Sequence, residues 1–131
     1  MTAKLNSFAP YALAALRIVV GLLFLQTGMQ KLFGFPPPLN PGELDTLRYV
    51  AGVLEFTGGP LVAVGFLTRP VAFILSGLMA FAYFLAHAPL DFFPANNMGT
   101  AAILFCFVFL YLVFAGPGAW SIDRWRALAW A

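Results

Sequence analysis

Two ionisable side chains lie inside stretches of this chain that otherwise have the length and composition of membrane-spanning helices. Lys31 closes the first stretch, and Glu55 lies within the second. A third ionisable residue, Arg17, lies near the start of the first stretch. Charged groups at membrane depth are costly, so they usually face a partner or a polar cavity. Because the chain has only seven basic and five acidic residues, these positions indicate where the functional region lies.

Several polar residues fall at the same predicted depth, in the outer third of the membrane. Glu55 is too short to reach water, so it is protonated, paired with a cation such as Lys31, or exposed to a water-filled cavity. Lys31 has the further option of extending to the lipid headgroups. Gln30 precedes Lys31, and Tyr83 and His87 share a face near the end of the third stretch. We treat these five residues as candidates for ligand binding.

Metal chemistry fits this set of residues badly. One histidine does not supply bis-imidazole haem ligation, and one cysteine, Cys106, holds neither an iron–sulfur cluster nor an intramolecular disulfide. The spacing of acidic, histidine and cysteine residues matches no zinc motif, and the chain lacks a glycine-rich phosphate loop and a G-x-S-x-G motif. We therefore predict no metal site and assign no catalytic residue.

A small polar pocket with aromatic walls is the remaining interpretation. Such a pocket suits an amphipathic ligand whose head group needs hydrogen bonds and whose tail lies in lipid. A quinone has these properties. Lys31, His87 or Tyr83 would donate to its carbonyl groups, and Glu55 would exchange a proton with it.

The composition explains why these residues must be placed within a lipid bilayer. The chain is 62% hydrophobic and 9% charged, whereas about a quarter of the residues in ordinary soluble domains are charged. So few charges do not cover the surface of a small soluble protein. A net charge of +2 with no Lys/Arg cluster also argues against nucleic acid as a partner.

The sequence predicts an all-α, single-domain protein over residues 1–131. A membrane-spanning helix needs about 20 mostly apolar residues, and the loops between the candidate spans are rich in proline and glycine. The predicted spans are approximately 11–33, 48–67, 71–88 and 98–115. Short connections between them predict an up-down-up-down four-helix bundle with both termini on one side.

The distribution of basic residues predicts the orientation of this bundle. Arg69 and Arg124 lie on the side of the termini, with Arg17 close by, and the opposite side is nearly balanced by acidic residues. The positive-inside rule therefore places the termini in the cytoplasm. We expect Arg17, Arg69, Asp123 and Arg124 to form a structural cluster there, separate from the outer site.

Helical phase predicts which face of the first span packs against the bundle. At 100° per residue, one narrow stripe contains Arg17, Gly21, Phe24, Gly28 and Lys31. The two glycines would let a neighbouring helix approach closely. The charged residues on this stripe are then expected to face the bundle rather than lipid.

An ordered set of short motifs resembles the DoxX family of small four-span membrane proteins. The set contains Leu16-Arg17, Gly28 to Gly34, Glu55 with Gly58-Gly59, then Leu61, Gly65, Thr68-Arg69 and Trp120 to Asp123. The resemblance implies a four-helix bundle in the bacterial cytoplasmic membrane, with Arg17, Lys31, Glu55 and Arg69 at signature positions. It also implies a redox setting, since the family takes its name from a quinone-linked oxidase or thiosulfate:quinone oxidoreductase subunit.

Three functional hypotheses follow for the chain. The leading one is a subunit or accessory protein of a membrane redox system that binds a quinone-like molecule. If the protein is catalytic, it is then a quinone-linked oxidoreductase subunit, with a redox protein or a second copy as partner. The second is a non-catalytic scaffold or assembly factor, which a closed Lys31–Glu55 contact and the absence of a ligand-sized pocket would favour. The third is a small-molecule permease that acts as an oligomer.

Overall fold

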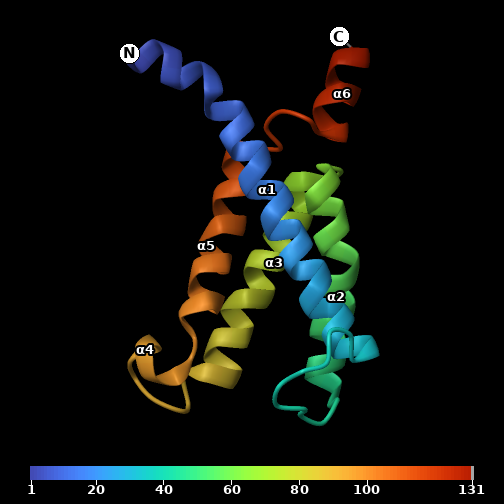
Figure 1. Cartoon of the computed structure of the whole chain (residues 1–131), viewed down its shortest axis with the longest axis vertical. Helices are drawn as coiled ribbons and strands as arrows, with labels where there is room; N and C mark the ends of the chain where they lie inside the picture. Colours follow the sequence, from blue (N-terminus) through green and yellow to red (C-terminus); the bar gives the residue numbers. More distant parts are fainter. Residues whose placement is uncertain (131) are drawn as a thin grey trace.

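The computed structural model describes residues 1–130, and within them the fold is entirely helical (Figure 1). Three helical segments are long and apolar enough to cross a membrane. They are α1 (Thr2–Phe33), α2 (Thr46–Val64) and a continuous segment made of α3 (Thr68–Ala82) and the π-helical turn η1 (Tyr83–His87). A shorter apolar helix, α5 (Thr100–Ala115), follows the four-residue α4 (Pro94–Asn97). The last helix among the described residues is α6 (Ile122–Ala129).

The long helices form two antiparallel pairs, α1 with α2 and α3 with α5, which account for most of the contacts between elements. Figure 1 shows the N- and C-termini at the same end of the molecule, with α4 and the loop between α1 and α2 at the opposite end. The chain direction therefore alternates from helix to helix, and the bundle consists of three span-length segments and the shorter α5 rather than the four full-length spans predicted.

Residues at the helix ends explain why the helix bounds differ from the predicted spans. α2 stops at Val64 rather than continuing to residue 67, because Gly65 adopts a left-handed conformation with φ of 69°. α3 begins at Thr68, before the predicted residue 71. The carboxylate of Asp123 accepts hydrogen bonds there from the backbone N–H groups of Leu67 and Thr68, at 2.9 and 2.8 Å. α1 extends through Pro10 to Thr2, beyond the apolar stretch that predicted the first span.

Glycine residues allow α1 and α2 to pack with their backbones in contact. A Cβ atom placed on Gly21 would lie 2.6 Å from the backbone nitrogen of Ala63, and one on Gly59 would lie 2.7 Å from the carbonyl oxygen of Gly21. The predicted stripe on α1 is buried at Arg17, Gly21, Phe24 and Gly28. The helix phase inferred from the sequence is therefore correct.

Aromatic and aliphatic side chains fill the space between the two helix pairs. Phe24 of α1 meets Phe109 of α5 edge to face, with ring centroids 4.6 Å apart. Leu75 and Leu112 are also fully buried in this core. Most of the other large apolar side chains face outward, as expected for helices whose outer surface contacts lipid.

Candidate functional site

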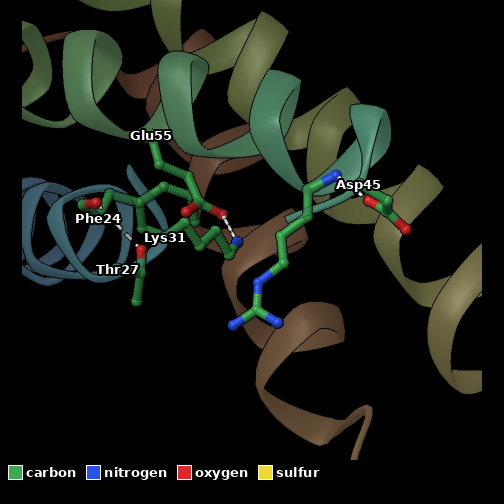
Figure 2. Close-up of polar contacts among 6 residues, drawn as sticks. Phe24, Thr27, Lys31, Asp45 and Glu55 are labelled. Atoms are coloured by element: carbon green, nitrogen blue, oxygen red, sulfur yellow. Dashed lines mark hydrogen bonds and ion pairs between the residues drawn. The ribbon is translucent and has the colours of Figure 1, made fainter. Parts of the chain in front are cut away.

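Lys31 of α1 and Glu55 of α2 form a direct ion pair at the end of the bundle opposite the termini. Figure 2 shows the two side chains pointing toward each other, with Lys31 Nζ 2.6 Å from Glu55 Oε1. The Glu55 side chain is 3% exposed and that of Lys31 is 26% exposed. The second carboxylate oxygen, Glu55 Oε2, is buried and has no hydrogen-bond partner among residues 1–130.

A cavity of about 270 Å³ borders this ion pair. Its polar lining comes from three helical segments, α1, α2 and η1, and its apolar walls include two phenylalanine rings that meet edge to face, with centroids 5.1 Å apart. The lining residues are Phe24, Thr27, Gln30, Lys31, Glu55, Met79, Ala82, His87, Ala101, Ala102 and Phe105. The site therefore combines a buried carboxylate, an ammonium group, an imidazole and an amide with apolar walls that include two phenylalanine rings.

His87 has one ring nitrogen engaged by the protein. Its Nδ1 lies 2.9 Å from the backbone oxygen of Asn97. Because a carbonyl oxygen only accepts, Nδ1 carries the proton of this hydrogen bond. The residue ends the π-helical turn, in which the Ala88 N–H donates to the Tyr83 oxygen at 2.8 Å. Such turns occur frequently at functional sites.

Asn97 holds the loop that supports His87, although the sequence did not single it out as a site residue. It is fully buried, and its amide nitrogen donates to the backbone oxygen of Asp91 at 3.0 Å and to the Tyr83 hydroxyl at 3.4 Å. Its side-chain oxygen accepts from the Gly99 N–H at 2.8 Å. The sequence signal for this role was an asparagine two residues before a glycine at the start of an apolar helix.

The structure brings four of the five candidate residues to one cavity, since Gln30, Lys31, Glu55 and His87 all line it. The amide nitrogen of Gln30 also donates to the Pro36 oxygen at 3.1 Å, which ties the following loop to α1. Tyr83 does not line this cavity. Its ring borders a separate apolar groove between α3 and α5, with Met79, Phe84 and Cys106 among its lining residues. The walls contributed by Thr27 and Phe105 were not selected from the sequence.

Arg17 lies at the other end of the bundle and is fully buried. Its guanidinium group donates to five backbone oxygens. Two of them, those of Val62 and Ala63, belong to the C-terminal turn of α2. The other three belong to the segment before α6, at Pro117, Ala119 and Trp120, with distances of 2.7, 3.1 and 2.9 Å. Arg17 therefore joins α1, α2 and the C-terminal segment.

The other members of the predicted terminal-side cluster also contact helix ends. Arg69 Nη1 donates to the oxygens of Val113 and Phe114 at the end of α5. Asp123 accepts from the start of α3. Partial burial raises the pKa of Asp123, but the backbone N–H donors of Thr68 and Leu67 and the charge of Arg126 outweigh it, so the pKa lies below its ordinary value. Arg124 is exposed, and only its backbone N–H takes part, donating to Ser121 Oγ at 3.2 Å.

Comparison with known proteins gives the relationships of this chain. The sequence pattern of the DoxX family matches residues 12–88. An uncharacterized protein of Haemophilus influenzae is 43% identical over 127 residues, which cover 92% of this chain and 95% of that protein. An uncharacterized membrane protein of Mycobacterium tuberculosis is 31% identical over 92% of this chain and 84% of its own length. The inner membrane protein YqjF of Escherichia coli is 31% identical over 87% of this chain and 91% of its own.

No solved structure matches the chain. The family pattern covers more than half of the sequence, and the relatives match along nearly their whole lengths. The apolar helices and the membrane location of these relatives agree with each other. The chain therefore belongs to the DoxX family and is a multi-pass protein of the inner membrane.

Proposed function

We propose that this DoxX protein binds the ring of a quinone-class molecule in the cavity beside Lys31 and Glu55. In this role it serves as a membrane subunit or accessory protein of a redox system. The observation that carries the proposal is Glu55 Oε2, a buried acceptor without a protein partner in a residue that lines a cavity with His87 and Lys31. A buried polar atom is normally satisfied, so an unsatisfied one beside a cavity supports a ligand site there.

The size of the cavity is consistent with a substituted aromatic ring. Its volume of about 270 Å³ lies just below the range for ligand pockets, which is roughly 300–1,000 Å³. An apolar cavity of about 150 Å³ is enough to hold benzene. The ring would occupy the cavity, and a hydrocarbon tail would extend into lipid.

The proposal includes a topology in which α5 is the fourth span and both termini are cytoplasmic. α5 has 16 residues, or about 24 Å at 1.5 Å per residue, which is short for a span. Basic residues in short loops favour the cytoplasm. Arg69 lies at the start of α3 and contacts the end of α5, and Arg124 and Arg126 lie in α6, which Figure 1 shows at the end with the termini. The cavity then opens toward the outer leaflet.

A ligand titration tests the proposal. Purified protein in detergent is titrated with 2-decyl-1,4-benzoquinone and its reduced form, and the melting temperature is measured. We expect the wild type to be stabilised by at least one of them, because a ligand that binds only the folded state raises the melting temperature. Glu55→Gln should reduce this shift. Glu43→Gln makes the same chemical change at an exposed loop position and should keep it.

One observation favours the scaffold hypothesis instead, namely the closed contact of 2.6 Å between Lys31 and Glu55. A purely structural ion pair predicts no stabilisation by either compound in any variant. It also predicts that Lys31→Met with Glu55→Leu, which replaces both charges by apolar groups, retains the association with protein partners. Stabilisation of the wild type together with its loss in Glu55→Gln would contradict the scaffold hypothesis.

A further inference from the structure

The three tryptophans of the chain all lie in or beside α6, and all three are exposed. Trp120 precedes the N-cap residue of α6, Trp125 lies within the helix, and Trp130 follows its last residue. Their exposed fractions are 68%, 70% and 88%, and that of Leu128 is 70%. So much exposed apolar surface on a short helix indicates that something other than water covers it.

One face of α6 is fixed to the end of the bundle. The Asp123 N–H donates to the Gly65 oxygen at 2.9 Å, and the Asp123 carboxylate accepts from the Thr68 N–H at 2.8 Å. The guanidinium group of Arg126 lies over the Phe66 ring, 5.4 Å from its centroid. Gly65 ends α2 and Thr68 begins α3. Because two membrane-spanning segments end there, α6 begins at the level of the lipid headgroups.

The opposite face of α6 combines apolar and basic side chains. At 100° per residue, Arg124, Leu128 and Trp125 follow one another on the side of the helix turned away from Asp123. All three residues are exposed. Tryptophan is enriched at membrane–water interfaces, and helices at a membrane surface combine an apolar face with basic residues.

The charge on α6 favours an anionic partner. Both carboxylate oxygens of Asp123, its only acidic residue, accept backbone hydrogen bonds. The guanidinium group of Arg124 has no hydrogen-bond or ion-pair partner within residues 1–130. Arg124 also borders an open cavity of about 360 Å³, whose other lining residues are Pro117, Gly118, Asp123 and Ala127. A cation at headgroup level with room beside it suits the headgroup of an anionic lipid.

A second copy of the chain matches this face less well. A symmetric contact joins the same patch on both copies, so it would bring two Arg124 side chains together, and like charges in an interface are unfavourable.

We propose that α6 is a lipid-recognition element that binds anionic phospholipids at the membrane surface on the side of the termini. Arg124 pairs with the negatively charged headgroup, and Trp125 and Leu128 lie against the adjoining part of the acyl chains. This surface is separate from the cavity beside Glu55, and it does not depend on the proposed function.

The fluorescence of the chain's own tryptophans tests the proposal, because all three lie at residues 120–130. The full-length protein is reconstituted in bilayers of equal amounts of phosphatidylcholine and phosphatidylglycerol. In one sample the acyl chains of phosphatidylcholine carry bromine, which quenches tryptophan at short range, and in the other those of phosphatidylglycerol carry it. Surface charge and bromine content are then identical in the two samples.

We expect brominated phosphatidylglycerol to quench about twofold more fluorescence than brominated phosphatidylcholine, because basic residues near the surface attract anionic lipid. The difference should shrink at high salt, since exposed charges are screened over about 3 Å at 1 M ionic strength.

Variants assign the effect to Arg124. Trp120→Phe with Trp130→Phe leaves Trp125 as the only reporter. In that background Arg124→Gln should remove most of the difference between the two lipids, and Arg124→Lys, which keeps the charge, should retain it. Arg48→Gln removes a charge at the start of α2, at the opposite end of the bundle, and should also retain it.

Three results would overturn the proposal. Equal quenching by the two brominated lipids would show lipid contact without selection of an anionic headgroup. Quenching by aqueous acrylamide but by neither lipid would place α6 in water. Protection from both lipid and acrylamide that increases with the density of protein in the bilayer would show that a second copy covers this face.

Discussion

Arg17 is a fully buried cation that is balanced by backbone carbonyl groups rather than by a carboxylate. Within residues 1–130, the Lys31–Glu55 contact is the only ion pair within 4.0 Å, so Arg17 has no acidic side chain in direct contact. Its partners at Val62 and Ala63 lie in the last turn of α2, where the helix dipole places partial negative charge. The partners at Pro117, Ala119 and Trp120 complete its hydrogen bonding. Planar guanidinium geometry is required to reach both sets at once.

The conservative change Arg17→Lys should therefore be strongly destabilising. A lysine keeps the charge, but one ammonium group does not span the carbonyls of α2 and of the C-terminal segment together. We expect the free energy of unfolding to fall by about 2 kcal/mol or more, since hydrogen bonds to charged groups contribute about 1.5–3 kcal/mol each. The measurement is unfolding in detergent, with Arg124→Lys, an exposed position, as the control. Equal stability of the two variants would show that the carbonyl contacts of Arg17 contribute little.

At the scale of the elements, α1 and α2 pack with their backbones in contact at glycine residues. Gly21 and Gly59 face each other across this interface. In lipid there is no hydrophobic force between helices, so association depends on such close packing. The Lys31–Glu55 pair joins the same two helices, and the helix packing therefore sets the geometry of the candidate site.

The glycine interface predicts that the same glycine-to-alanine substitution changes stability differently at two positions. Gly21→Ala places a methyl group 2.6 Å from backbone atoms of α2 and should destabilise the protein by about 1–3 kcal/mol through overpacking. Gly77→Ala in α3 meets nothing within 4 Å and should be neutral or stabilising by up to about 1 kcal/mol, because alanine favours helix. Denaturation in detergent compares the two. A loss of stability in Gly77→Ala as large as that in Gly21→Ala would contradict this account.

The contact between Asp123 and the start of α3 predicts a dependence of stability on pH. The folded pKa lies below the ordinary value of 3.8, so the carboxylate stabilises the fold fully above that pH. This contribution is lost as the pH falls below 3.8 through the folded pKa. We expect the difference in melting temperature between wild type and Asp123→Asn to stay constant at pH values well above 3.8 and to shrink as the pH is lowered below 3.8 toward 2. Glu43→Gln, at an exposed loop position, should show no such trend, and a constant difference for Asp123→Asn would refute the role of its charge.

At the scale of the whole molecule, the sequence predicted the features that depend on helix periodicity and on helix-breaking residues. Loops rich in proline and glycine predicted where the helices end. The stripe on α1 predicted that Lys31 faces the bundle, where it contacts Glu55. The sequence did not predict the hydrogen bonds of Asn97. These bonds fix the short α4 and the loop beside it, and such local contacts leave no periodic pattern in the sequence. It also did not identify Phe105 as a wall, since α5 is apolar on every side and no phase distinguishes its faces.

The proposed topology predicts which loops can be labelled from outside. In a Cys106→Ala background, Asn40→Cys introduces a thiol in the exposed loop between α1 and α2, and Ser7→Cys introduces one near the N-terminus. A membrane-impermeant maleimide should label Asn40→Cys in intact spheroplasts and label Ser7→Cys only after permeabilisation. Both variants should react fully in detergent. The reverse pattern in spheroplasts would invert the orientation.

The carbonyl partners of Arg17 also impose an order on how the protein is made. α1 emerges from the ribosome first, but Val62 follows Arg17 by 45 residues and Pro117 by 100. The guanidinium group of Arg17 therefore meets its full set of backbone acceptors only after Pro117 to Trp120 have been made. A chain truncated before Pro117 would lack three of its five acceptors. We expect the melting temperature of such a chain in detergent to be lower, because the buried guanidinium group would keep donors without partners, so Arg17 couples the stability of α1 to a segment 100 residues away.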